Sequence, residues 1–116
     1  MKILIVDDDQ NILRLYKEEL EEEGYTVITA ANGKEAIEQF DKEEPDIVTL
    51  DILLPDIDGI KLLRQIKEKR PRLPVIMSTA YDYRDDFAVW ASEAYIVKSA
   101  DLQELKATIK KLSTQE

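Results

Sequence analysis

The sequence predicts a doubly wound α/β domain, in which a parallel sheet of five strands is covered by five helices on its two faces. Five short, nearly all-apolar runs occur at 2–6, 26–30, 46–50, 74–79 and 94–97. Such runs are typical of strands that are buried on both faces. Segments with helical spacing separate them, and this alternation favours a parallel sheet wrapped by helices. The length of 116 residues fits one domain, 1–116.

Each expected helix is marked by apolar residues that recur at a spacing of three or four residues, which places them on one face. In chain order these stripes are Ile12, Tyr16 and Leu20; Ala36, Ile37 and Phe40; Ile60, Leu63 and Ile66; Phe87 and Trp90; and Leu102, Leu105, Ile109 and Leu112. The fourth stripe is the shortest. We expect the last stripe to form core, with a dimer contact as the second interpretation.

Residues between these segments favour helix ends and turns. Gly24 stands where a helix C-terminus takes a left-handed residue, and Asn32 with Glu35 has the spacing of a capping box. Asp9 has the position of an N-cap for the first helix. Asp56 and Asp58 are interpreted as turn and cap residues rather than as metal ligands.

Histidine and cysteine are both absent from the sequence. Disulfides, a thiol nucleophile and an imidazole base are therefore excluded, and a metal must be bound through oxygen, which favours hard ions such as Mg²⁺. The 25 acidic and 16 basic residues give a net charge of −9, which argues against direct binding to nucleic acid or to an anionic membrane. No apolar run has the length of a membrane span or a signal peptide, so we expect a cytoplasmic protein.

Polar side chains gather where the expected strands end. Asp7, Asp8 and Asp9 follow the first strand, Asp51 follows the third, Thr79 closes the fourth beside Ser78, and Lys98 follows the fifth. Parallel strands end at the same edge of a sheet, and ligands bind there at the point where the strand order switches. Strand alternation directs the side chain of Ser78 to the opposite face from that of Thr79.

The clustered carboxylates indicate a divalent cation, because neighbouring ionised aspartates repel one another unless a cation lies between them. A phosphoryl group could then be held by the cation, with Lys98 and Thr79 contacting its oxygens. One aspartate would be the nucleophile. The residues alone thus predict an oxygen-ligated metal and anion site of the phosphoryl-transfer type.

Four segments, "ILIVDDD", "IVTLDILLPDIDG", "VIMSTA" and "YIVK", resemble in their order and spacing the receiver domain of two-component response regulators. The resemblance covers essentially the whole chain. It implies a flavodoxin-like fold with strand order 2-1-3-4-5 and a signalling switch that accepts a phosphoryl group, rather than an enzyme. The implied donor is a sensor histidine kinase or a histidine phosphotransfer protein. The output partner is unknown, and a phosphorylation-dependent dimer is left open.

The resemblance also implies a role for each matching residue. Asp51 matches the phosphoacceptor. The implied ligands of Mg²⁺ or Mn²⁺ are Asp8 directly, Asp7 through water, Asp51 itself and the backbone carbonyl of Leu53.

Three further positions match residues that respond to the phosphoryl group. Thr79 matches the hydroxyl residue that senses it, Tyr95 the aromatic switch residue, and Lys98 the lysine that pairs with a phosphoryl oxygen. The common pattern continues after the lysine with proline, whose preceding peptide bond is cis, whereas this chain has Ser99. A cis bond before such a residue costs ~3–4 kcal/mol, so a trans bond in a rearranged loop and a strained cis bond both remain open.

Two other functions compete with the switch. A phosphatase with an aspartate nucleophile usually has a second aspartate two residues later, where this chain has Leu53. A phosphorylation-independent interaction module would keep only the fold, and the intact set of Asp7, Asp8, Asp51, Thr79 and Lys98 argues against it. The bulk of Leu53 and Tyr81, which flank the expected path of attacking water, predicts slow autodephosphorylation.

Overall fold

The computed structural model describes residues 1–79, 94–97 and 102–113. Five parallel strands form one sheet in the order β2-β1-β3-β4-β5, as the sequence predicts. The strands are β1 (Lys2–Val6), β2 (Thr26–Ala30), β3 (Ile47–Leu50), β4 (Val75–Thr79) and β5 (Ala94–Val97). The described part of the chain contains the helices α1 (Gln10–Glu22), α2 (Gly33–Glu43), α3 (Gly59–Lys69) and α4 (Gln103–Ser113). The helix expected around Phe87 and Trp90 falls in 80–93, outside the described residues.

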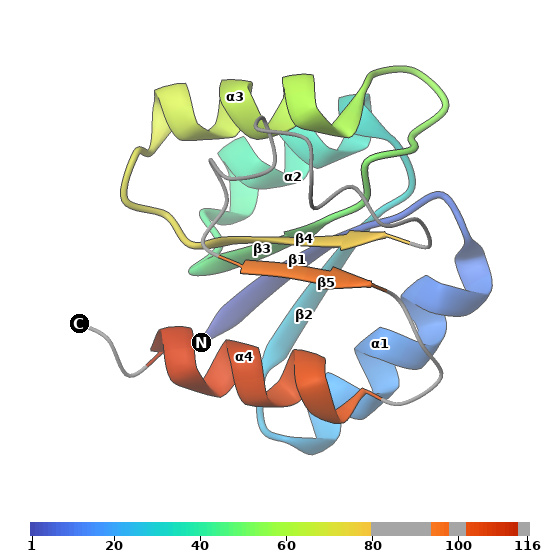
Figure 1. Ribbon diagram of the computed structural model, residues 1–116, viewed down its shortest axis with the longest axis vertical. Coiled ribbons are helices and arrows are strands. Elements are labelled where there is room, and N and C mark those ends of the chain that lie inside the picture. Colours follow the sequence, from blue (N-terminus) through green and yellow to red (C-terminus); the bar gives the residue numbers. More distant parts are fainter. Residues whose placement is uncertain (80–93, 98–101, 114–116) are drawn as a thin grey trace.

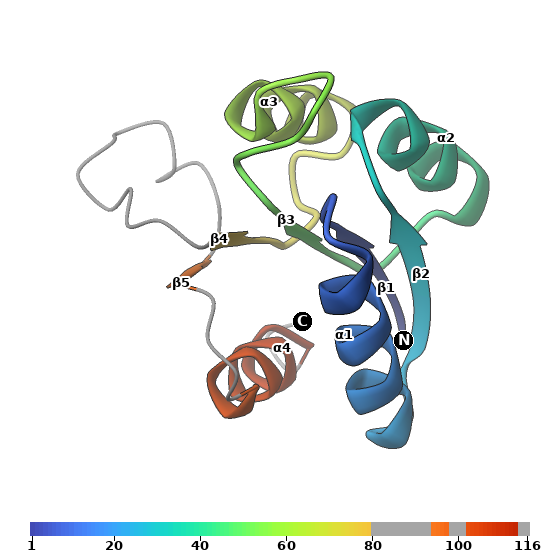
Figure 2. The ribbon, with the colours of Figure 1, turned by 90° about the vertical axis from the view of Figure 1, so that its right-hand side faces the viewer.

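Helices cover both faces of the sheet. Helices α2 and α3 lie on one face, and α1 and α4 lie on the other (Figures 1 and 2). Strand alternation divides the core accordingly, because Leu4 and Val6 of β1 belong to the first layer while Ile3 and Ile5 belong to the second. Burial of a side chain of this size stabilises the fold by roughly 1.5–3 kcal/mol, so two such layers fix the register of the central strands.

Strand β1 lies at the point where the strand order reverses. Its last residue, Val6, pairs with Ala30 of β2 on one side and with Leu50 of β3 on the other. The residues that follow β1 and β3 in the chain therefore leave the sheet side by side. In open sheets of this type the ligand site lies at this position.

The helix ends confirm the predicted caps. The carboxylate of Asp9 accepts hydrogen bonds from the N–H groups of Asn11 at 2.9 Å and Ile12 at 3.4 Å, at the start of α1. Gly24 has a φ of 95° just after α1, which favours glycine. At the start of α2, Asn32 Oδ1 accepts from the Glu35 N–H at 2.8 Å.

Among the described residues, no helix is both long enough and apolar enough to cross a membrane.

The loop between β3 and α3 is folded back on itself. Leu53 and Asp58 form an isolated antiparallel bridge, and the N–H of Gly59 donates to the carbonyl of Ile52 at 2.8 Å. A Cβ atom on Gly59 would lie 2.1 Å from the carbonyl oxygen of Asp51 and 2.5 Å from Cα of Ile52. Both neighbours are backbone atoms, so only glycine allows this approach.

We therefore predict that Gly59→Ala lowers the free energy of unfolding by about 2–3 kcal/mol, because the loop has to move away from the new methyl group. Gly24→Ala is the control, since a Cβ there meets nothing within 4 Å and only the positive φ opposes it. Its expected cost is about 1 kcal/mol. Urea denaturation of both variants measures the difference, and equal costs would contradict the role assigned to the close approach.

Ser78 of β4 is a buried polar residue in the layer beneath α1 and α4, where its neighbour two residues earlier, Ile76, is core. Its side chain is 3% exposed, and its hydroxyl has no hydrogen-bond partner among the described residues. An unsatisfied buried hydroxyl costs free energy because it gives up hydrogen bonds to water.

We predict that Ser78→Ala raises the free energy of unfolding by about 1 kcal/mol. Ser113→Ala is the matched change at a serine whose Oγ donates to the carbonyl of Lys110 at 2.8 Å, and it should bring no gain. Urea denaturation again reports both values. A loss of stability in Ser78→Ala would show that this hydroxyl has a partner in the folded protein.

Candidate functional site

Three aspartates meet where β1 and β3 end. Asp7, Asp8 and Asp51 each place a carboxylate oxygen so that all three oxygens lie within 4.8 Å of one another. Asp7 is 2% exposed and Asp51 is 5% exposed, whereas Asp8 reaches the solvent. Two ionised carboxylates at this distance repel by on the order of 3 kcal/mol at an effective dielectric constant of about 20. The predicted convergence of these three side chains is confirmed.

The backbone holds the two buried aspartates at neighbouring positions. The N–H of Asp7 donates to the carbonyl of Ala30 at 3.1 Å, and the N–H of Asp51 donates to the carbonyl of Val6 at 3.1 Å. The hydrogen bonds of the sheet thus continue one residue beyond the strands on both sides of β1. The position of each Cα is therefore set by the sheet rather than by a mobile loop.

Local N–H groups orient the two buried carboxylates. Oδ1 of Asp7 accepts from the N–H of Asp9 at 3.0 Å, and Oδ1 of Asp51 accepts from the N–H of Leu53 at 3.3 Å. Asp9 consequently has two roles, because its own carboxylate caps α1. These bonds restrict the rotation of the side chains and keep their oxygens directed at a common point.

The donor set suits a small hard cation. All three groups are carboxylates, and the sequence offers no histidine or cysteine to any metal. Oxygen ligands, with some coordination positions left to water or a phosphate, are the preference of Mg²⁺, and Mn²⁺ accepts the same ligands. A cation here would also offset the repulsion among the carboxylates. The role of the Leu53 backbone carbonyl as a further ligand stays a prediction. Leu53 itself is 48% exposed.

The remaining predicted site residues are placed only in part. Thr79 is the last residue of β4 and pairs with Val97 of β5, and Tyr95 pairs with Met77. The side chains of Thr79 and Tyr95 lie outside the described residues, as do Tyr81, Lys98 and the Lys98–Ser99 bond. The pairing of β4 with β5 does bring the end of β5, which Lys98 follows in the chain, to the same edge as the three aspartates.

The other two aspartates of the β3–α3 loop, which the sequence predicts to be turn and cap residues, both accept hydrogen bonds from helix N-termini, but of different helices. Asp58 caps α3, because its Oδ1 accepts from the Ile60 N–H at 2.8 Å. Asp56 instead binds the start of α2, where its Oδ1 accepts from Gly33 N–H at 2.8 Å and its Oδ2 from Lys34 N–H at 3.0 Å. The pKa of Asp56 is lowered, chiefly by the hydrogen bond from Gly33, against an opposing desolvation effect. No local pattern signals this contact, since the partners are 23 residues apart.

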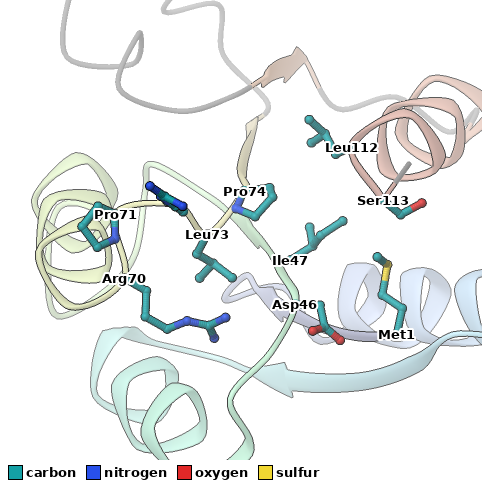
Figure 3. A pocket seen from close by; sticks show the side chains of 10 residues that line it. Met1, Asp46, Ile47, Arg70, Pro71, Leu73, Pro74, Leu112 and Ser113 are labelled. Atoms are coloured by element: carbon teal, nitrogen blue, oxygen red, sulfur yellow. The ribbon is translucent and has the colours of Figure 1, made fainter. Parts of the chain in front are cut away.

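A hollow of about 780 Å³ lies at the other edge of the sheet (Figure 3). Residues that precede strands line it, among them Met1, Asp46 and Pro74, together with Leu112 near the end of α4. It is thus separated from the carboxylates by the length of the strands. The hollow and the carboxylate cluster are therefore separate features of the domain.

Comparisons with known proteins agree with this geometry. The family model described as the response regulator receiver domain matches residues 3–110. The alkaline phosphatase synthesis transcriptional regulatory protein PhoP of Bacillus subtilis is 37% identical over 112 residues, which are 94% of this chain and 47% of PhoP. The chain therefore spans about half the length of that relative.

Solved structures agree with the same family. The response regulator TrrA of Thermotoga maritima, in complex with Mg²⁺ and BeF, has a TM-score of 0.92 and 46% identity, and the match covers 96% of this chain and 97% of TrrA. A complex of histidine kinase ThkA with TrrA matches with a TM-score of 0.90 at the same identity and coverage. The fold, the carboxylate cluster and the family match over 3–110 lead to one conclusion, which is that this chain belongs to the response regulator receiver domain family.

Proposed function

We propose that residues 1–116 form a receiver domain that accepts a phosphoryl group on Asp51 and acts as a signalling switch. The observation that carries this proposal is the cluster of carboxylate oxygens from Asp7, Asp8 and Asp51 within 4.8 Å of one another. Mg²⁺, or Mn²⁺ in its place, would be held by these three residues and by the backbone carbonyl of Leu53. When bound, the cation neutralises charge on the phosphoryl oxygens. The complex of TrrA with Mg²⁺ and BeF supports the assignment.

Asp51 is the proposed nucleophile because it has the position of the phosphoacceptor in the receiver-domain pattern; its hydrogen bonds with Val6 and Leu53 keep it in the cluster. One of its carboxylate oxygens forms a bond to phosphorus while the bond from phosphorus to the donor atom breaks. The electron pair of the broken bond leaves with the donor. The product is an acyl phosphate, a recognised covalent form of an aspartate nucleophile.

The proposed donor is a phosphohistidine on a sensor histidine kinase or a histidine phosphotransfer protein. The complex of ThkA with TrrA supports a kinase partner for a protein of this type. The proposal names no partner that receives the signal. A phosphorylation-dependent dimer is compatible with it.

Thr79, Tyr95 and Lys98 are assigned to the response. Lys98 would pair with one phosphoryl oxygen and Thr79 would donate to another, after which Tyr95 would change position. The backbone supports this grouping, because Thr79 ends β4 beside β5, the strand that contains Tyr95 and precedes Lys98. The phosphorylated form would thereby shift a pre-existing equilibrium between two conformations.

We predict that acetyl phosphate with Mg²⁺ adds the mass of one phosphoryl group to the intact protein, as measured by mass spectrometry. Asp51→Asn should abolish the addition because it removes the nucleophilic carboxylate but keeps the shape of the side chain. Asp41→Asn is the control, since Asp41 is an exposed aspartate of α2 that pairs with Lys69. If the parent gains no mass, or if Asp51→Asn still gains it, the chain is a phosphorylation-independent module or uses another acceptor.

We also predict slow loss of the phosphoryl group, because Leu53 is exposed and its backbone N–H contacts Asp51, so that its bulky side chain would obstruct the approach of water. Leu53→Asn should increase the rate of autodephosphorylation severalfold, since an amide can hydrogen-bond the attacking water. The decay of the phosphorylated mass after removal of acetyl phosphate measures it. Leu15→Asn, at an exposed leucine of α1, is the matched change that should leave the rate as it is.

A further inference from the structure

The carboxylate of Asp56 joins the β3–α3 loop to helix α2. Its two oxygens accept from consecutive N–H groups, Gly33 at 2.8 Å and Lys34 at 3.0 Å. These N–H groups belong to the first turn of α2 and have no partner within the helix. The helix dipole adds to the attraction, because its positive end faces an ionised carboxylate.

Helix α2 also has a cap of its own. Asn32 Oδ1 accepts from the Glu35 N–H at 2.8 Å, and its Nδ2 donates to the Glu35 carboxylate at 2.9 Å. The free N–H groups at the start of α2 thus have two acceptors. Asn32 accepts from Glu35, and Asp56 of the loop accepts from Gly33 and Lys34. Since the local cap already begins the helix, the main structural consequence of Asp56 is the connection between the two segments.

Close packing accompanies this connection. A Cβ atom on Gly33 would lie 2.1 Å from Cγ2 of Ile57, the residue next to Asp56. Glycine at this position lets the loop approach the helix, and Ile57 packs against the core layer beneath α2 and α3. The loop is therefore held on its outer side by hydrogen bonds and on its inner side by apolar contact.

The same loop leads directly to the carboxylate cluster. From Asp56 the chain returns through the bridge between Leu53 and Asp58, and Leu53 donates its N–H to Oδ1 of Asp51 at 3.3 Å. A shift of the loop at Asp56 would therefore also move Leu53. This residue orients the proposed phosphoacceptor Asp51 through its N–H and supplies a proposed metal ligand through its carbonyl group.

We propose that Asp56 is a positioning residue for the metal site, an inference that rests on the proposed function. Its two hydrogen bonds to α2 keep the loop in the one arrangement in which Leu53 and Asp51 can share a cation with Asp7 and Asp8. Asp56 itself is not one of the three clustered carboxylates that would hold the cation. The hydrogen bond from Gly33 lowers the pKa of Asp56, so this acceptor stays ionised in more acidic solution than an ordinary aspartate does.

The test is the rate of phosphorylation by acetyl phosphate, measured by mass spectrometry over a series of Mg²⁺ concentrations. For Asp56→Ala, the Mg²⁺ concentration at half-maximal rate should rise about tenfold, which is typical for loss of a residue that supports metal ligands. The rate at saturating Mg²⁺ should stay close to that of the parent, because every reacting group is still present. Asp56→Asn keeps one oxygen acceptor and should recover part of the affinity.

Asn32→Ala is the matched control. It removes a hydrogen-bond acceptor from the same end of α2 but leaves the connection to the loop in place. The Mg²⁺ dependence of this variant should equal that of the parent even if its urea midpoint falls. An equal shift in Asn32→Ala and Asp56→Ala, or no shift in Asp56→Ala and Asp56→Asn, would overturn the inference and leave Asp56 as a simple helix cap.

Direct titration with Mg²⁺, followed by amide shifts in NMR spectra, separates this inference from the proposed function. If the parent binds Mg²⁺ but accepts no phosphoryl group, the proposed function fails. The inference then still stands or falls on whether Asp56→Ala binds Mg²⁺ more weakly than Asn32→Ala does.

Discussion

Mutual repulsion among Asp7, Asp8 and Asp51 is the constraint that the rest of the structure has to accommodate. The two buried members follow strands that are adjacent only because the strand order reverses at β1. Apolar layers on both faces of the sheet fix the register of β1 and β3, and therefore fix the distance between the carboxylates. Core packing thus holds together charges that would otherwise separate. A divalent cation between these carboxylates would lower their mutual repulsion.

The β3–α3 loop contains Asp51 and Leu53, and its contacts hold both residues in position. Two glycines outside the loop allow it to lie close to its neighbours, Gly59 against the backbone of Asp51 and Gly33 against Ile57. Hydrogen bonds then close the loop from within, between Gly59 and Ile52, and from outside, between Asp56 and α2. A loop held at so many points has few alternative conformations, so the entropic cost of ordering it around a ligand is small.

The sequence predicts the features that depend on local interactions or on the regular geometry of a parallel sheet. The strands, Asp9 and Asn32 as caps, Gly24 as a left-handed residue and the convergence of the aspartates all follow from periodicity, capping chemistry and the geometry of parallel strands. The sequence does not predict the hydrogen bonds of Asp56 to α2. They depend on how the loop passes Gly33, which lies 23 residues earlier in the chain. The buried face of α1 is also shifted: Leu13 is fully in the core, whereas the predicted Ile12 is only half-buried. A stripe of three residues defines a helix face to within about one position, and tertiary packing selects the final orientation.

The two ends of the parallel strands differ in their residues. The hollow lies at the end where the strands begin, and the carboxylate cluster lies at the end where they finish. At the end of the sheet where the strands begin, positively charged side chains and hydrogen-bond donors meet carboxylates and carbonyl groups. The Lys2 N–H donates to Asp46 Oδ2 at 2.8 Å, Lys2 Nζ lies 3.4 Å from Glu43 Oε2, and Arg70 donates to the carbonyl of Pro45 at 2.7 Å. Such contacts satisfy one another, and exposed ion pairs of this kind contribute about 0–1 kcal/mol each. Asp46 and Arg70, which line the hollow at that end, thus already have hydrogen-bond partners within the protein (Figure 3). At the carboxyl ends of the strands, the described residues include the carboxylates of Asp7, Asp8 and Asp51, and oxygen atoms grouped this closely suit a hard cation.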